Sequence, residues 1–179
     1  GMLGIMDDPK HFMTLDFKEE GDFIFLVGPA KDDLGSSEYL RWIHNQEISP
    51  CPTLDLEEEV RYQAVVLGLI HSGKVESVHD VSDGGLFTTL TESAMASGLG
   101  FVINTDPAKR KDAYLFGESQ SRYVVSVNPD NLDNFTSLLD KEHAEYFILG
   151  QVSGSELVID GESFGLISEW KEINENTIG

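Results

Sequence analysis

Short apolar, β-prone runs alternate with longer amphipathic runs along this chain, and glycine or proline marks many of the boundaries between them. The run at 22–27 ends at Gly28 and Pro29, which is typical of a buried strand. A looser alternation predicts another strand at 12–17. Further strands are predicted at 75–81, 101–104, 122–127, 146–152 and 156–160. Such alternation indicates α and β layers packed around a shared core, an α/β or α+β sandwich.

The amphipathic runs predict the helices. The clearest begins at Asp55, which can cap the helix start, and ends at Gly73. Its apolar residues at helical spacing are expected to face the core, namely Leu56, Val60, Ala64, Leu67 and Ile70. A helix is also predicted at 34–44, with Leu40 and Ile43 inward. Others are predicted at 84–98, 132–139 and 166–173.

The charge balance restricts the kinds of partner. The chain has 12 basic and 32 acidic residues, a formal net charge of −20, and shows no basic stripe. Such a surface repels nucleic acid and anionic membranes, so neither is an expected partner. A phosphorylated metabolite could still bind, but only at a local site built from backbone N–H groups, an arginine or a bridging metal.

Cysteine and hydropathy bear on the compartment. Cys51 is the single cysteine, which excludes an intrachain disulfide and favours a reducing, cytoplasmic location. The N-terminal residues lack the pattern of a signal peptide. No stretch approaches the roughly 20 apolar residues of a membrane span. We expect a single domain over residues 1–179 that is an excerpt of a longer multidomain chain.

The segment 77–86 is the first candidate for ligand binding. A predicted strand ends near Asp80, and Gly84 and Gly85 then open a helix. Glycines let a backbone approach a ligand, and a helix start offers free N–H groups to an anion. Asp80 is a possible Mg²⁺ ligand, because Mg²⁺ combines one or two carboxylates with phosphate oxygens. The plainer alternative is a tight strand-to-helix turn capped by Asp80 or Asp83.

Magnitudes favour a metal-bridged phosphate over a bare one at this segment. A helix start stabilises an anion by roughly 0.3–1 kcal/mol. Each carboxylate near 4 Å opposes the anion by about 1–4 kcal/mol. Micromolar affinity needs about 8 kcal/mol, so this segment alone cannot hold a nucleotide.

The segment 116–122 is the second candidate. Glu118, Ser119 and Gln120 offer groups that bind ribose, amide or phosphate, and Arg122 could clamp a carboxylate or phosphate in bidentate fashion. The alternative is an ordinary loop in which Arg122 pairs with one of the many carboxylates. At 32–38, Ser36 or Ser37 is expected to cap a helix rather than to bind an anion.

The two main segments resemble a known family. The stretch 79–86 is similar to the His-Asp-x-x-x-Gly-Gly-Leu signature of aminoimidazole ribonucleotide synthetase C-terminal domains, and 116–122 is similar to their Gly-Glu-Ser-x-x-Arg segment. Within that superfamily, 15–22, 33–39 and 52–57 resemble the phosphoribosylformylglycinamidine synthases, also called formylglycinamide ribonucleotide amidotransferases. The resemblance implies a layered sandwich with a mixed sheet and flanking helices.

The resemblance also implies a reaction. In that family ATP phosphorylates the amide oxygen of formylglycinamide ribonucleotide, Mg²⁺ assists, and ammonia from a glutaminase displaces the phosphate. The implied partners are an upstream ATP-binding domain, a glutaminase subunit or domain, and a phosphorylated ribonucleotide substrate. By position, the family's metal ligand maps to Asp80 and its substrate-binding residues map to Glu118, Ser119 and Gln120.

Several alternatives stay open at this point. The final Glu169-Trp170-Lys171 is similar to the second of two duplicated halves. In a second-half copy, Asp80, Glu118, Ser119 and Gln120 would line a pseudo-symmetric site, and no catalytic residue is expected. The domain could then be a purely structural module. Other superfamily members are aminoimidazole ribonucleotide synthetase, selenophosphate synthetase, thiamine-phosphate kinase and a hydrogenase-maturation factor.

Overall fold

The chain folds around one mixed sheet of seven strands, in the order β2-β4-β1-β5-β3-β6-β7. The computed structural model describes residues 4–178. The strands are β1 Phe23–Val27, β2 Ser77–Asp80, β3 Phe101–Ile103, β4 Tyr123–Val127, β5 Tyr146–Val152, β6 Glu156–Ile159 and β7 Glu162–Leu166. Strands β3 and β6 run parallel, and the other neighbouring pairs are antiparallel. The predicted α/β sandwich with a mixed sheet is confirmed.

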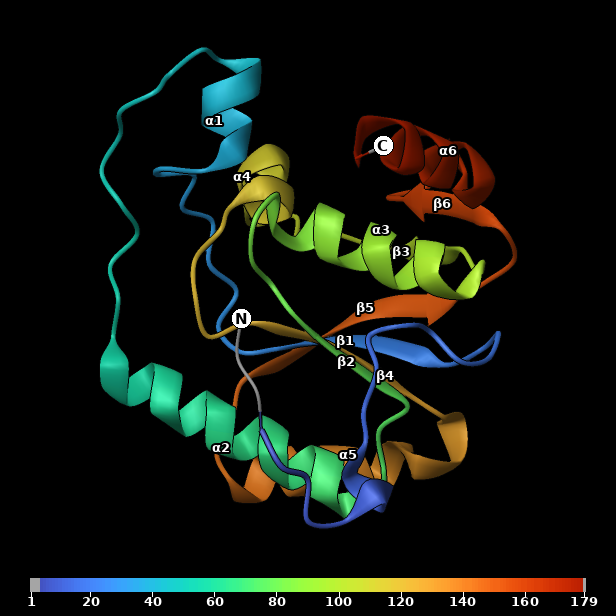
Figure 1. Ribbon diagram of the computed structural model, residues 1–179. Helices are drawn as coiled ribbons and strands as arrows, with labels where there is room; N and C mark the ends of the chain where they lie inside the picture. Colours follow the sequence, from blue (N-terminus) through green and yellow to red (C-terminus); the bar gives the residue numbers. More distant parts are fainter. Residues whose placement is uncertain (1–3, 179) are drawn as a thin grey trace.

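Helices cover both faces of the sheet, as Figure 1 shows. One face carries α3 Gly85–Ser97, α4 Lys111–Phe116 and α6 Ile167–Ile178; the other carries α2 Leu56–Ser72 and α5 Leu132–Lys141. Alternate residues of β1 point to opposite sides, so Ile24 and Leu26 join one apolar core while Phe25 and Val27 join the other. A short helix, α1 Glu38–Ile43, and two 3₁₀ turns, η1 Pro9–His11 and η2 Pro129–Asn131, complete the fold.

Helix α2 confirms its predicted ends and contradicts its predicted inner face. The Asp55 carboxylate accepts hydrogen bonds from the N–H groups of Glu57 and Glu58, and Gly73 ends the helix in the left-handed conformation at φ 65°. The side chains that face the sheet are Tyr62, Val65, Val66 and Leu69. The stripe predicted to be inward, Leu56, Val60, Ala64 and Leu67, is exposed instead, and Ile70 is half-buried. Both faces of α2 carry apolar residues, so periodicity alone pointed to the wrong one.

Two other predicted elements need correction. The segment 12–17 is not a strand. One backbone hydrogen bond, from the Val78 N–H to the Thr14 carbonyl oxygen, joins it to β2, whereas the Phe17 N–H donates to the carbonyl oxygen of Ser93 in α3. Helix α1 begins at Glu38 rather than at residue 34, because Ser36 has a φ of 56° and interrupts the helical path. Ile43, predicted to point inward, is 64% exposed.

One α-helix and one strand were not predicted from the sequence. Helix α4 buries the consecutive residues Ala113, Tyr114 and Leu115, so it shows no helical period, and no side chain caps its start. Strand β7 lies at the edge of the sheet and contains Gly165 at φ 94°. Among the described residues, no helix has the length and apolarity that crossing a bilayer requires.

Candidate functional site

The two predicted ligand segments lie side by side at one end of the sheet. Strands β2 and β4 pair so that Asp80 stands opposite Tyr123. Just beyond the pair, the N–H of Val81 donates to the carbonyl oxygen of Arg122 at 2.9 Å. The strand-to-helix turn at 81–85 and the loop at 117–122 therefore form one local unit.

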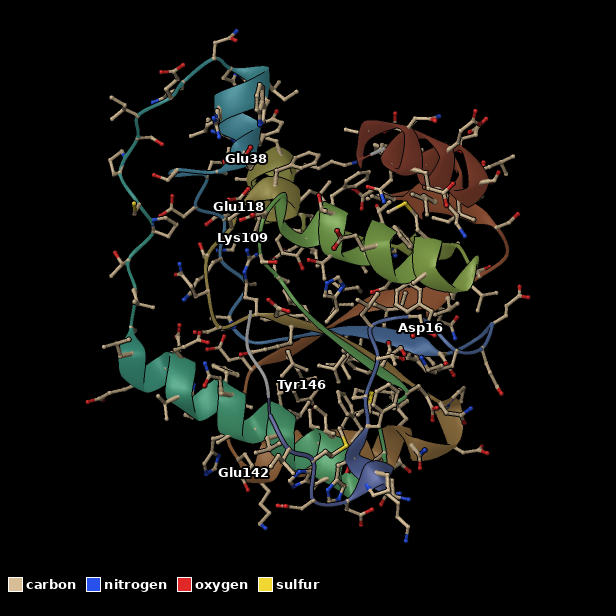
Figure 2. All side chains as sticks on the ribbon, in the orientation of Figure 1. Asp16, Glu38, Lys109, Glu118, Glu142 and Tyr146 are labelled. Atoms are coloured by element: carbon tan, nitrogen blue, oxygen red, sulfur yellow. The ribbon has the colours of Figure 1, made fainter. Side chains whose placement is uncertain are left out.

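The Glu118 carboxylate connects three elements within this unit. Its Oε1 atom accepts hydrogen bonds from the N–H of Gly84, at the start of α3, and from the N–H of Glu38, at the start of α1, both at 2.8 Å. Figure 2 shows Glu118 next to Glu38 where α1, α3 and α4 converge. A helix start attracts negative charge, and here the chain supplies that charge itself. An external phosphate would have to displace Glu118 to bind the first turn of α3.

Gly85 is explained by packing within the chain. Its φ of 68° is one that side chains rarely adopt. A Cβ atom at Gly85 would lie 2.7 Å from the carbonyl oxygens of Leu115 and Gly117, closer than any real contact. The glycine thus allows the start of α3 to rest on the end of α4, and this close approach requires no ligand.

Arg122 lies inside the unit and stabilises the loop. Its side chain is only 1% exposed. Nε donates to the carbonyl oxygen of Ser119 at 2.9 Å, and Nη2 donates to that of Gly117 at 2.6 Å. Burial lowers the pKa of Arg122 to about 10, and none of the ion pairs formed by the described residues includes it. Instead of the ion pair with a carboxylate that was the alternative interpretation, Arg122 forms an internal brace of the loop.

The remaining loop residues differ in what they present to solvent. Ser119 is buried. Within the described part of the chain, neither its Oγ nor the Nη1 atom of Arg122 has a hydrogen-bond partner. Gln120 is exposed. Ser121 has a φ of 66°, and its hydroxyl donates to the Glu59 carboxylate at 2.7 Å. Of the predicted Glu-Ser-Gln set, Gln120 is therefore the side chain most open to a ligand.

Carboxylates surround the outer side of this unit. Asp80 is exposed at the end of β2. Burial raises the pKa of Tyr123 to about 12, and the charges of Glu59 and Asp80 add to the effect. Burial acts to raise the pKa of Glu59, but hydrogen bonds from Ser121 and Gln63 outweigh it and lower that pKa below its usual value. Near Tyr123, these two carboxylates therefore favour a cation over a bare anion.

Asp80 has the chemistry of a partial magnesium site. Among residues 4–178, no group of three or more histidine, cysteine or acidic side chains is arranged to hold a metal ion. Mg²⁺ in nucleotide sites needs only one or two protein carboxylates and takes phosphate and water oxygens for the rest. A single exposed carboxylate is compatible with that pattern.

Sequence reasoning missed Glu38 and Glu59 as members of this unit. Glu59 lies in the first turns of α2, and its contact with Ser121 joins residues 62 positions apart. Of the two predicted caps of α1, Ser36 and Ser37, it is Ser37 that caps the helix. Its Oγ accepts a hydrogen bond from the Leu40 N–H. Nothing local in the sequence indicates that Glu38 donates its N–H to Glu118. A polar hollow of about 390 Å³ borders Glu38 and is also lined by Ser36, Ser37, Arg41, Gln46 and Glu47.

Known proteins share both the sequence and the fold. Residues 19–160 match the family described as AIR synthase related protein, C-terminal domain. The phosphoribosylformylglycinamidine synthase subunit PurL of Alkaliphilus metalliredigens is 39% identical over an alignment of 179 positions, which covers 96% of this chain and 24% of that protein. The same subunit of Nitrobacter hamburgensis is 40% identical, with 90% and 22% covered. The chain thus spans about a quarter of the length of the curated relatives it matches.

Solved structures support the fold. Thermotoga maritima PurL complexed with FGAR has a TM-score of 0.73 at 17% identity, covering 91% of this chain and 30% of that one. The E. coli hydrogenase maturation protein HypE has a TM-score of 0.61 at 18% identity, covering 87% and 52%. At these identities the likeness concerns the fold alone.

Proposed function

The chain belongs to the family of AIR synthase related C-terminal domains, and we propose that it serves as such a domain in a phosphoribosylformylglycinamidine synthase. That enzyme would convert formylglycinamide ribonucleotide, ATP and glutamine-derived ammonia into formylglycinamidine ribonucleotide, a ligase reaction of purine biosynthesis. The observation that carries the proposal is 39% identity over 96% of the chain to a protein of that name.

The proposal includes the rest of the enzyme. Residues 1–179 would form one domain of a longer protein, since the relatives are about four times as long. An upstream ATP-binding domain would supply the catalytic residues and most of the nucleotide site. A glutaminase subunit or domain would supply ammonia. The enzyme would be cytoplasmic, which suits a chain with a single cysteine.

The chain's own residues would serve binding and positioning. Mg²⁺, when bound, would neutralise charge on the transferring phosphoryl group. Asp80 would hold the Mg²⁺, and Gln120 would face the ribonucleotide. Both side chains are exposed, and the two segments that carry them lie side by side. Arg122 fixes the loop that carries Gln120 through the carbonyls of Gly117 and Ser119. Gly84 and Gly85 set the start of α3 against that loop.

A structural role in the same enzyme is the second candidate. Glu118 already occupies the start of α3, and Arg122 is turned inward, so two of the groups expected to bind ligand are engaged within the chain. This arrangement suits a pseudo-symmetric domain that supports the catalytic half. The two candidates differ in whether Asp80 contributes to nucleotide binding.

The reaction is tested with the full-length enzyme that contains this domain. We expect ADP release with ATP, ammonium and formylglycinamide ribonucleotide, because ammonium replaces the glutaminase. Thiamine monophosphate and formylglycinamidine ribonucleotide in place of that substrate should give no release. Release with either of them alone would assign the chain to a different superfamily enzyme.

The role of Asp80 is tested in the same enzyme with Asp80→Asn. Loss of one carboxylate ligand should weaken Mg·ADP binding about tenfold, a change of 1.4 kcal/mol in binding free energy. Asp130→Asn, in the η2 turn outside this unit, is the matched control and should leave the affinity unchanged. Equal affinity for both variants would favour the structural role.

A further inference from the structure

Helix α2 carries an apolar stripe on each of two opposite faces. At about 100° per residue, the sheet-facing residues Tyr62, Val65, Val66 and Leu69 lie on one side of the helix. The second stripe runs along the opposite side through Leu56, Val60, Ala64 and Leu67. Leu56 is 67% exposed, Val60 65% and Leu67 53%. We call this second stripe the outer face of α2.

Such a pattern is unusual for a helix that borders solvent. A surface helix of a globular protein normally has one apolar face and one polar face, whereas a helix apolar on both sides is normally covered on both. Single exposed apolar residues are common, but a contiguous stripe marks a site of interaction. In Figure 1, α2 lies at the rim of the molecule with the sheet on its inner side.

The surface beside the outer face is shaped to receive side chains. A hollow of about 300 Å³ lies between α2 and α5 and is lined by Arg61, Ala64, Gly68, Leu138 and Glu142 among others. Another hollow, of about 560 Å³, lies where residues 4–11 pass the last turns of α2, at Leu67, Ile70 and His71. The small residues Ala64 and Gly68 allow a partner to approach the helix backbone closely.

The charges around the outer face indicate its occupant. The rim carries the carboxylates of Asp55 and Glu57 at one end and those of Asp7 and Asp8 at the other. Its basic groups are Arg61 between the two ends, and Lys10 with the stacked pair His11 and His71 beside Asp7 and Asp8. A second copy of this chain would bring a similar rim and a net charge of −20 against the first. Like charges facing each other across an interface oppose association.

We propose that the outer face of α2 docks a different protein surface, with aliphatic side chains at its centre and lysine or arginine around them. The aliphatic centre covers Leu56, Val60 and Leu67, and the basic rim meets the carboxylates at the two ends. This inference rests on the exposure and charge of α2 and holds whichever reaction the full enzyme catalyses.

The test uses a synthetic amphipathic helix of leucine and lysine as the probe, titrated into the chain by calorimetry at physiological ionic strength. The wild-type chain should bind it, and Leu56→Gln/Val60→Gln should weaken binding at least about tenfold. The matched control is Ile148→Gln/Ile173→Gln, which changes two residues of similar exposure on β5 and α6. The control should retain the wild-type affinity.

Two further measurements make the test independent of how the variants fold. In the wild-type chain, the probe should slow amide exchange at 56–67 and leave β5 and α6 unchanged. A probe with glutamate in place of lysine should not bind. Equal weakening in both double variants, or equal binding of the glutamate probe, would overturn the proposal. So would sedimentation showing a wild-type dimer that Leu56→Gln/Val60→Gln converts to a monomer.

Discussion

Arg122 carries a guanidinium into the interior, where no carboxylate among its described contacts balances it. The groups that compensate are the carbonyl oxygens of Gly117 and Ser119, which would otherwise be buried without a donor. Removing the side chain therefore has two opposed effects: it relieves the desolvation of the charge and leaves two carbonyls unpaired. The second effect should exceed the first, because a buried carbonyl left without a donor costs about 1–3 kcal/mol and two of them are affected.

We expect Arg122→Met, which keeps the length of the side chain, to lower the free energy of unfolding by about 2–3 kcal/mol. Arg110→Met is the control, because Arg110 is exposed and pairs with its neighbour Asp112. Urea unfolding followed by circular dichroism measures both. A loss no larger in Arg122→Met than in Arg110→Met would show that the loop does not need the internal brace.

The hydrogen bonds of the Glu59 carboxylate can be tested through the pH dependence of stability. The pKa of Glu59 is lower in the folded chain than its ordinary value of 4.5, so the folded state favours the ionised form. The stabilisation is complete above the unfolded pKa and is lost as the pH falls through the folded pKa. The difference in unfolding free energy between wild type and Glu59→Gln should be largest near neutral pH and shrink below about pH 4.5. A difference that stays constant down to acid pH would contradict the assigned hydrogen bonds.

At the scale of elements, the start of α3 depends on a close backbone approach. Gly85 and Gly73 have nearly the same φ, 68° and 65°, but a Cβ at Gly85 would meet the carbonyls of Leu115 and Gly117, whereas one at Gly73 would meet nothing within 4 Å. Gly73→Ala should therefore lower the free energy of unfolding only by the cost of placing alanine in the left-handed conformation, about 1–2 kcal/mol. Gly85→Ala should show that strain and an added steric penalty.

The two alanine variants can be compared by thermal unfolding. We expect Gly85→Ala to lower the midpoint at least about twice as far as Gly73→Ala, since overpacking adds about 1–3 kcal/mol. Similar midpoints for the two variants would mean that the end of α4 can move aside, and that Gly85 is needed for its φ alone.

Most elements could be predicted from the sequence where local signals agree. Asp55 and Gly73 mark both ends of α2 because a cap and a left-handed glycine act within one turn. The outer face of α2 was assigned wrongly, because periodicity does not indicate which of two apolar stripes meets the sheet. At the site, the adjacency of the two segments follows from β2 pairing with β4, but the contact of Glu118 with Gly84 and Glu38 depends on tertiary packing.

The whole molecule combines two apolar cores with an excess of negative charge. The sheet separates the cores, so the buried apolar side chains of β1 and β4 belong to one core or to the other. The net charge of −20 opposes this compact arrangement, because like charges are closer in the folded chain than in the unfolded one. The ion pairs among the described residues are few and mostly exposed, so they offset little of that repulsion.

Salt should accordingly stabilise the fold. Raising the ionic strength from about 0.01 M to about 0.15 M shortens the screening length from about 30 Å to about 8 Å, so long-range repulsion is reduced more than contact pairs are. Differential scanning calorimetry should show a higher unfolding midpoint at the higher salt. A lower midpoint would mean that the specific ion pairs contribute more than the general repulsion.

The account depends most on Glu118 as the carboxylate that joins the starts of α3 and α1. Hydrogen exchange of individual amides, measured by NMR in the wild-type chain and in Glu118→Ala, tests it directly. We predict that the amides of Gly84 and Glu38 are protected in the wild type and that both lose protection together, by about tenfold or more, in the variant. Unchanged protection at both amides, or a loss at only one, would contradict the shared carboxylate and with it the single unit formed by the two segments.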